Sequence, residues 1–397
     1  MQAIFKKTVH FPAGYVIIKK KWEGGSFMNK LLKIAVAFLL CAVLCASSVS
    51  ACEMYPIRDI EPVGTTVEIK EETDDSVTLR KTGDGPFKIL MFTDIHLATL
   101  DKKQPLKDRK VTIEKMIQNI RREKPDLVLL GGDNVTSSFN LGRTHQLARI
   151  FEKLGVYWGG ILGNHEGDNL FSIRRSTMVK VFSAYDHCLM RQGLKDVDGD
   201  CNYVIRILND DGSLKQAVFC FDSFDGMPAK DAKAHGLDPA DKPYDVIKQS
   251  QIDWYKSQVD AVKKEFGKCP SFALLHVPLT QFKDALAQVN DGKMQFLWGE
   301  SHEGVSAAGY DSGLFDAIKA SQCTTHIFAG HDHINTFGVK YDGVILSYIE
   351  PSGYGAYDMY SKFGSPEEEW LEGYTRLTLA DDGTFTHEQF RNSALPA

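Results

Sequence analysis

Five short apolar segments of this chain have the composition of buried strands, and each runs within three residues into polar residues of a metal-binding kind. The segments are residues 87–92, 126–130, 156–162, 272–275 and 325–329. The polar residues that follow them are Asp94 and His96, Asp133, Asn164 and His165, His276, and His331 and His333. Because the carboxyl ends of parallel strands meet at one sheet edge, where ligands bind, we expect these side chains to lie close together.

The rest of the chain fits one large α/β domain. Helical periodicity over residues 105–122 and 146–154 separates the first three strands, and this alternation predicts a parallel sheet. Further helices are expected near 177–184 and 251–266, strands near 203–207, 217–221, 336–340 and 344–349, and hairpins at 65–81 and 375–388. No internal repeat or low-complexity linker is present. We therefore expect a linker and hairpin over 52–86 and one domain over 87–397.

The types of polar residue at the strand ends indicate a metal site. Carboxylates and imidazoles together suit Fe, Mn and Zn ions. Asp94 and His96, like His331 and His333, are alternate residues, which point the same way on an extended chain. Glycines before Asp133, Asn164 and His331 allow sharp turns. A single histidine at a strand end is more often structural, but five such elements in a fixed order indicate a binding site.

In this order the elements resemble the calcineurin-like metallophosphoesterase superfamily, whose motifs are D-x-H, G-D, G-N-H-[DE], H and G-H-x-H. The resemblance runs from Phe87 to about Tyr357. Finer features are similar to the purple acid phosphatase-like branch that keeps D-x-H: residues 276–279, 312–314, 330–335 and 353–357. Typical purple enzymes have Asp and Tyr in place of Asp94 and His96, so neither the purple colour nor a specific Fe(III) follows.

The resemblance implies a four-layer α/β/β/α sandwich with two metal ions, Fe, Mn or Zn, at its strand edge. One metal would take Asp94, His96 and His333, the other Asn164, His276 and His331, and Asp133 would bridge them. His165 would face the substrate as the catalytic residue, or else hold a ligand in place. Substrate contacts are also considered for Arg174, Arg175 and His302, although a solvated helix start is the simpler interpretation of the two arginines.

The implied activity is hydrolysis of small phosphate esters, phosphomonoesters first, by a hydroxide shared between the metals. A phosphodiesterase or nucleotidase of the same fold is one alternative, and a non-catalytic surface-binding lipoprotein is another. The complete ligand set and His165 favour catalysis. Without residues 1–51, which hold seven Lys and one Glu, the chain has 39 basic and 51 acidic side chains, a net charge of −12. Nucleic acid is therefore not expected as the main partner.

The amino-terminal region has the features of an export signal. A basic start at Met28, an uncharged apolar run over 34–46 and small residues before Cys52 are typical of a secretory signal over 28–51. The run is short for a membrane-spanning helix, which needs about 20 apolar residues. Residues 49–52 also resemble a lipobox, so the mature chain is either secreted or tethered to a membrane through lipidated Cys52, in the periplasm or at the cell surface.

Residues 1–27 are interpreted as translated leader ahead of the true start at Met28. Export permits a disulfide, and Cys188 and Cys201 are the nearest pair of cysteines beyond Cys52.

Overall fold

Two β-sheets form the centre of the domain in the computed structural model, which describes residue 33 and residues 55–98, 106–167 and 171–395. The first sheet has the order β1-β2-β6-β7-β8-β9-β11-β10 and the second has the order β13-β12-β3-β4-β5. The strands of the first are β1 (Val67–Glu72), β2 (Ser76–Lys81), β6 (Tyr203–Leu208), β7 (Leu214–Cys220), β8 (Ser271–Leu274), β9 (Thr324–Ala329), β10 (Gly338–Tyr341) and β11 (Val344–Tyr348). Those of the second are β3 (Phe87–Phe92), β4 (Leu127–Gly131), β5 (Trp158–Ile161), β12 (Gly373–Leu379) and β13 (Phe385–Arg391).

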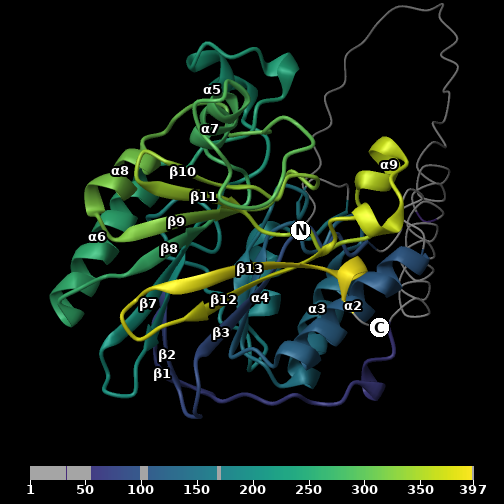
Figure 1. Cartoon of the computed structure of the whole chain (residues 1–397), viewed down its shortest axis with the longest axis vertical. Helices are drawn as coiled ribbons and strands as arrows, with labels where there is room; N and C mark the ends of the chain where they lie inside the picture. Colours follow the sequence, from purple (N-terminus) through teal and green to yellow (C-terminus); the bar gives the residue numbers. More distant parts are fainter. Residues whose placement is uncertain (1–32, 34–54, 99–105, 168–170, 396–397) are drawn as a thin grey trace, which may run out of the picture. The chain divides into compact units, whose positions relative to one another are not determined.

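Helices cover the outer face of each sheet (Figure 1). The α-helices of the described domain are α2 (Leu106–Glu123), α3 (Leu141–Leu154), α4 (Arg175–Phe182), α5 (Ala229–Ala234), α6 (Gln249–Phe266), α7 (Thr280–Asn290), α8 (Leu314–Ser321) and α9 (Met359–Phe363). Of these, α5 and α9 pack in small clusters apart from the two sheets. Short 3₁₀ helices lie at Ile57–Asp59, Pro239–Asp241, Glu367–Glu369 and Asn392–Ala394. Side chains of α2, α3 and α4 pack in one core cluster with β3, β4 and β5, and those of α6, α7 and α8 in another with the eight-stranded sheet.

Alternation along the strands explains why the eight-stranded sheet is covered on both faces. On β8, Phe272 faces the core between the sheets, while Ala273 faces the core under α6, α7 and α8. The ring of Phe272 lies 5.3 Å from that of Phe328 on β9 and 5.7 Å from that of Phe385 on β13, so it joins the two sheets. The four-layer α/β/β/α sandwich is therefore confirmed.

The expected strands and helices are present, but their assignment to one parallel sheet edge is wrong. β3, β4 and β5 are parallel neighbours in the five-stranded sheet, whereas β8 and β9 are parallel neighbours in the eight-stranded sheet. Both sheets also contain antiparallel pairs, such as β6 with β7 and β12 with β3. The hairpin β1–β2 joins the eight-stranded sheet through a parallel pairing of β2 with β6. The polar strand ends therefore come from two sheets rather than one.

The five cysteines of the described domain, Cys188, Cys201, Cys220, Cys269 and Cys323, are buried free thiols. The expected Cys188–Cys201 disulfide is thus wrong. Chain contacts separate residues 1–49 from residues 50–397, and Lys33 is the single described residue of the first unit. The expected signal over 28–51, apart from Lys33, and Cys52 lie outside the described residues. Among the helices of the described parts, none has the length and apolar character to cross a membrane.

The position of Phe272 between the sheets gives a test of the fold. Truncation in Phe272→Ala removes a fully buried ring and leaves a cavity, which should cost about 3–5 kcal/mol of unfolding free energy. Phe363→Ala is the matched control, because Phe363 is 59% exposed and its loss should change stability by less than about 0.5 kcal/mol. Thermal and denaturant unfolding measure both. Equal stabilities of the two variants would contradict the inter-sheet core.

Candidate metal centre

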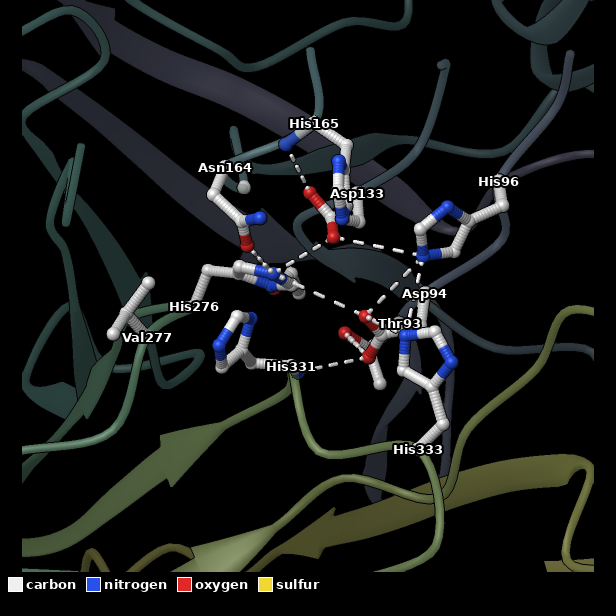
Figure 2. A network of polar contacts seen from close by, with 12 residues as sticks. Thr93, Asp94, His96, Asp133, Asn164, His165, His276, Val277, His331 and His333 are labelled. Carbon is white, nitrogen blue, oxygen red and sulfur yellow. Dashed lines mark hydrogen bonds and ion pairs between the residues drawn. The ribbon is translucent and has the colours of Figure 1, made fainter. Parts of the chain in front are cut away.

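Seven polar side chains from five strand ends converge where the two sheets meet (Figure 2). They are Asp94 and His96 after β3, Asp133 after β4, Asn164 after β5, His276 after β8, and His331 and His333 after β9. All seven are buried, with relative exposures of 7% or less. The structure thus brings together every ligand candidate that the sequence indicates.

The donor atoms form two groups that share one carboxylate. Asp94, His96, Asp133 and His333 offer ligand atoms that all lie within 4.8 Å of one another, and so do Asp133, His276 and His331. Asn164 adds its amide oxygen, which lies 3.1 Å from Nε2 of His276. Two groups with a common member are the arrangement expected of two neighbouring cation sites bridged by Asp133.

The backbone at these strand ends is strained. Asp94, His96, Asp133 and His331 have φ values of 55°, 50°, 50° and 82°, in the left-handed region that non-glycine residues rarely adopt. The expected extended geometry of Asp94 and His96 is therefore wrong, and tight turns direct these side chains into the centre. Such conformations persist where the surrounding structure enforces them, commonly at functional sites.

Two carboxylate oxygens in the centre lack hydrogen-bond donors. Oδ1 of Asp94 and Oδ2 of Asp133 are buried without a hydrogen-bond partner. Nε2 of His333 lies 3.3 Å from the first, and Nε2 of His276 lies 3.1 Å from the second. Buried polar atoms are rarely left unsatisfied in native proteins, so these oxygens indicate a missing partner of positive charge.

The tautomers of two histidines also fit metal binding. Nδ1 of His276 lies 2.8 Å from the carbonyl oxygen of Gly131, and Nδ1 of His333 lies 3.2 Å from that of Tyr357. A carbonyl oxygen only accepts hydrogen bonds, so each Nδ1 carries a hydrogen. In a neutral ring the lone pair is then on Nε2, which faces the carboxylates, and this is how metal-binding histidines are held. The residues present fit a pair of cations.

Burial and mutual attraction set the charges of the cluster. Burial lowers the pKa of His331 to about 3, so this imidazole is neutral and can offer its lone pair. Burial alone would raise the pKa of Asp133, but attraction to the nearby imidazole of His276 holds it well below its usual value. Burial likewise opposes the charged form of His276, yet Asp133 raises the pKa of that imidazole to about 10. The centre thus holds ionised carboxylates and attracts positive charge.

Glu166 ties two of the ligand-bearing loops together, a role that the sequence motif alone does not reveal. Its Oε1 accepts hydrogen bonds from the backbone N–H of Asn134 at 2.5 Å and from Nδ2 of Asn134 at 3.1 Å. Its Oε2 accepts from the backbone N–H of Gly163 at 2.9 Å. Burial, and then the charge of Asp133, raise the pKa of Glu166 to about 7. The side chain therefore sets the spacing between Asp133 and Asn164.

Close packing explains two of the motif glycines. A Cβ atom at Gly163 would collide with the carboxylate of Asp133, and one at Gly330 would meet Oδ2 of Asp94 at 2.9 Å. These glycines let the loops approach the carboxylates, rather than supplying an unusual backbone angle.

A cleft of about 630 Å³ opens over the centre, and His165 lines it. The backbone N–H of His165 donates to Oδ1 of Asp133 at 2.8 Å, and its ring centroid lies 5.4 Å from that of His96. The other lining residues are His96, Asp133, Tyr244, Glu303, Ser306, His331, His333, Gly355, Ala356, Tyr357, Ser361 and Lys362. Tyr244 and Lys362 belong to no motif, so no pattern in the sequence indicates that they line the cleft.

The three weaker candidates for substrate contact do not line this cleft. Arg174 is exposed at the start of α4. The guanidinium of Arg175 donates to the carbonyl oxygen of Gly163 and pairs with the buried carboxylate of Asp222. Nε2 of His302 lies 2.8 Å from Oε2 of Glu300. Arg175 thus holds the loop that carries Asn164, through its contact with Gly163, and does not reach the cleft.

Comparisons with known proteins point in one direction. A family model described as calcineurin-like phosphoesterase matches residues 87–335. Two Arabidopsis thaliana proteins, named probable inactive purple acid phosphatase 14 and 29, are 28% and 29% identical, each over 70% of this chain and over 73% and 75% of their own lengths. A Saccharomyces cerevisiae protein named Phosphatase DCR2 is 25% identical over 72% of this chain and 49% of its own. A solved dimetal phosphatase from Danio rerio shares the fold, with a TM-score of 0.51 at 12% identity, and covers 77% of this chain and 96% of that one.

The bridging contacts of Glu166 give a test of how the centre is held. Glu166→Gln places an amide NH₂ against backbone donors, so the two loops should separate and metal affinity should fall by about 10–100-fold. Competition with a chelator measures that affinity. The matched control is Glu369→Gln, because Glu369 is exposed in a 3₁₀ helix outside the cleft. Native affinity in Glu166→Gln would show that the loops do not depend on this carboxylate.

Proposed function

We propose that this chain, which belongs to the calcineurin-like phosphoesterase family and to its purple acid phosphatase-like branch, hydrolyses phosphomonoesters. The observation that carries the proposal is the pair of donor groups that share Asp133 beneath a cleft lined by His165. That arrangement supports hydrolysis of a phosphate ester at this centre.

The proposed ligand sets follow the two donor groups. Asp94, His96 and His333 would hold one metal ion, Asn164, His276 and His331 would hold the other, and Asp133 would contribute to both sites. Mixed imidazole and oxygen donors suit Fe, Mn or Zn. Two such ions supply the acidity that deprotonates a water and the positive charge that neutralises phosphoryl oxygens. Asn164 is a neutral oxygen donor, which limits the negative charge presented to an anionic ester.

His165 is the proposed catalytic residue. Its backbone is fixed by the hydrogen bond to Asp133, while its side chain borders the cleft. A histidine there can donate a proton to the leaving oxygen, a role worth about 10²–10⁴-fold in rate, or it can donate a hydrogen bond to a phosphoryl oxygen. The cleft volume of about 630 Å³ is in the range of small-molecule sites, about 300–1,000 Å³.

Two other functions remain as candidates. A phosphodiesterase or nucleotidase would use the same centre with a different leaving group. A non-catalytic binding protein is favoured by one observation, since two relatives are named as inactive purple acid phosphatases. The complete donor set with His165 supports catalysis instead, because a binding protein does not need a proton donor over the metals.

Elemental analysis beside a phosphatase assay tests the function. The purified protein should contain two metal ions per chain and hydrolyse p-nitrophenyl phosphate faster than the bis-ester. Asp133→Ala should lose metal and turnover together. His165→Ala should lose about 10²–10⁴-fold in kcat but keep its metal content. Metal loss in His165→Ala would overturn its catalytic role, faster hydrolysis of the bis-ester would indicate a diesterase, and full occupancy without turnover would favour the binding protein.

We further propose that residues 28–51 are a signal peptide ahead of a domain over 87–397, and that Cys52 is the lipid-bearing first residue of the mature chain, which places the protein outside the cytoplasm. When the whole chain is expressed in a bacterial host, mass spectrometry should find a mature chain that begins at lipid-bearing Cys52 and no peptide from residues 1–27. Cys52→Ser should move the protein from the detergent phase to the aqueous phase, because the acyl chains are its anchor. An unmodified Cys52 would indicate ordinary secretion, and peptides from residues 1–27 would rule out the start at Met28.

A further inference from the structure

The short helix α9 is fixed beside the metal centre by buried contacts. Met359 is 6% exposed and packs with Ile334 and Leu371 in a small core cluster. Ile334 directly follows His333, so this cluster couples α9 to a proposed ligand loop. Asp358 caps the helix, because its carboxylate accepts from the backbone N–H of Ser361 at 2.6 Å. The backbone of α9 therefore has a defined position at the cleft.

The ring of Tyr357 lies between His333 of the metal centre and Lys362 of α9. Its ring stacks on that of His333, with centroids 4.3 Å apart and an interplanar angle of 13°. Its hydroxyl donates to Oε1 of Glu303 at 2.8 Å. Nζ of Lys362 lies 4.4 Å from the Tyr357 ring centroid. Because His333 covers one face of the ring, the ammonium lies over the other, one aromatic ring away from a proposed ligand.

Lys362 is the single Lys or Arg among the described residues that line the cleft. It forms no ion pair with a carboxylate in the described part of the chain, and its recorded partner is the Tyr357 ring. Glu303, which lines the cleft as well, already accepts hydrogen bonds from Tyr357 and from the backbone N–H of Ile334 at 3.2 Å. An exposed cation is thus available at the rim of a cleft whose floor is built from imidazoles and carboxylates.

We propose that Lys362 binds a second anionic group, a carboxylate or a phosphate, on the leaving-group side of the substrate. The inference rests on the proposed phosphomonoesterase function. With the scissile phosphate at the metal centre, the leaving group runs past the edge of Tyr357 and its distal anion meets Lys362. The preferred substrates are then small phosphomonoesters with two separated anionic groups, rather than esters of neutral alcohols.

Two ester substrates that differ by one distal charge test this subsite. Phenyl phosphate and 4-carboxyphenyl phosphate share a leaving oxygen and a ring, and the native protein should prefer the second. Lys362→Gln should lower the ratio of their kcat/KM values by about tenfold, mainly through KM, because a charge-assisted contact to the ground state is lost. Lys362→Glu should reverse the preference. High salt should weaken the native preference, because an exposed charge pair is screened.

Lys340→Gln is the matched control. Lys340 is an exposed lysine on β10 that does not line the cleft, so its removal changes net charge equally and should leave the ratio at the native value. If the native protein hydrolyses phenyl phosphate and Lys362→Gln keeps the native ratio, the subsite is wrong while the proposed function stands.

A binding measurement keeps the inference testable without turnover. Calorimetry of metal-loaded protein with phenylphosphonate and 4-carboxyphenylphosphonate should show tighter binding of the second. In Lys362→Gln the ratio of the two Kd values should fall by about tenfold. Absence of hydrolysis together with this loss would remove the proposed function and retain the anion subsite. Equal affinities of the two phosphonates for the native protein would overturn the subsite in either case.

Discussion

The metal centre depends on two carboxylates, Asp94 and Asp133, which are buried close together. One oxygen of each, Oδ1 of Asp94 and Oδ2 of Asp133, has no hydrogen-bond partner. Burying an ionised group without a partner is costly, and a neighbouring cation is the strongest compensation available. Other features of the centre serve the same arrangement. Left-handed backbone turns direct the carboxylates inward, motif glycines give them room, and backbone carbonyls orient His276 and His333 so that Nε2 faces them.

The packing of the two sheets brings two sets of strand ends together at the metal centre. The loops after β3, β4 and β5 belong to one sheet and those after β8 and β9 belong to the other, so the donor geometry depends on how the sheets are packed. Phe272 and Phe385 hold that packing through the core between the sheets. Stability of the inter-sheet core and integrity of the metal centre are therefore linked, although the two regions share no residue.

Much of this centre could be predicted from the sequence, because its residues follow apolar strands in a fixed order. The partition of β8 and β9 into a second sheet could not, since apolar composition indicates a strand without naming its neighbour. The role of Arg175 was equally hidden: Asp222, its partner, is 47 positions away, and only the folded chain places that carboxylate behind the loop of Asn164. Left-handed turns at Asp94 and His96 were missed because alternate residues suggest an extended chain.

The whole chain is negatively charged, whereas an anionic ester needs positive charge at the site where it binds. The sequence is acidic, with a formal net charge of −6. Two divalent ions at the centre would more than offset Asp94 and Asp133, so attraction of an anion at the cleft floor depends on the metals. At the rim it depends on Lys362, which has no motif to mark it. A change at this single rim residue can therefore alter the substrate preference while the fold and the donors stay the same, because fold alone does not determine activity.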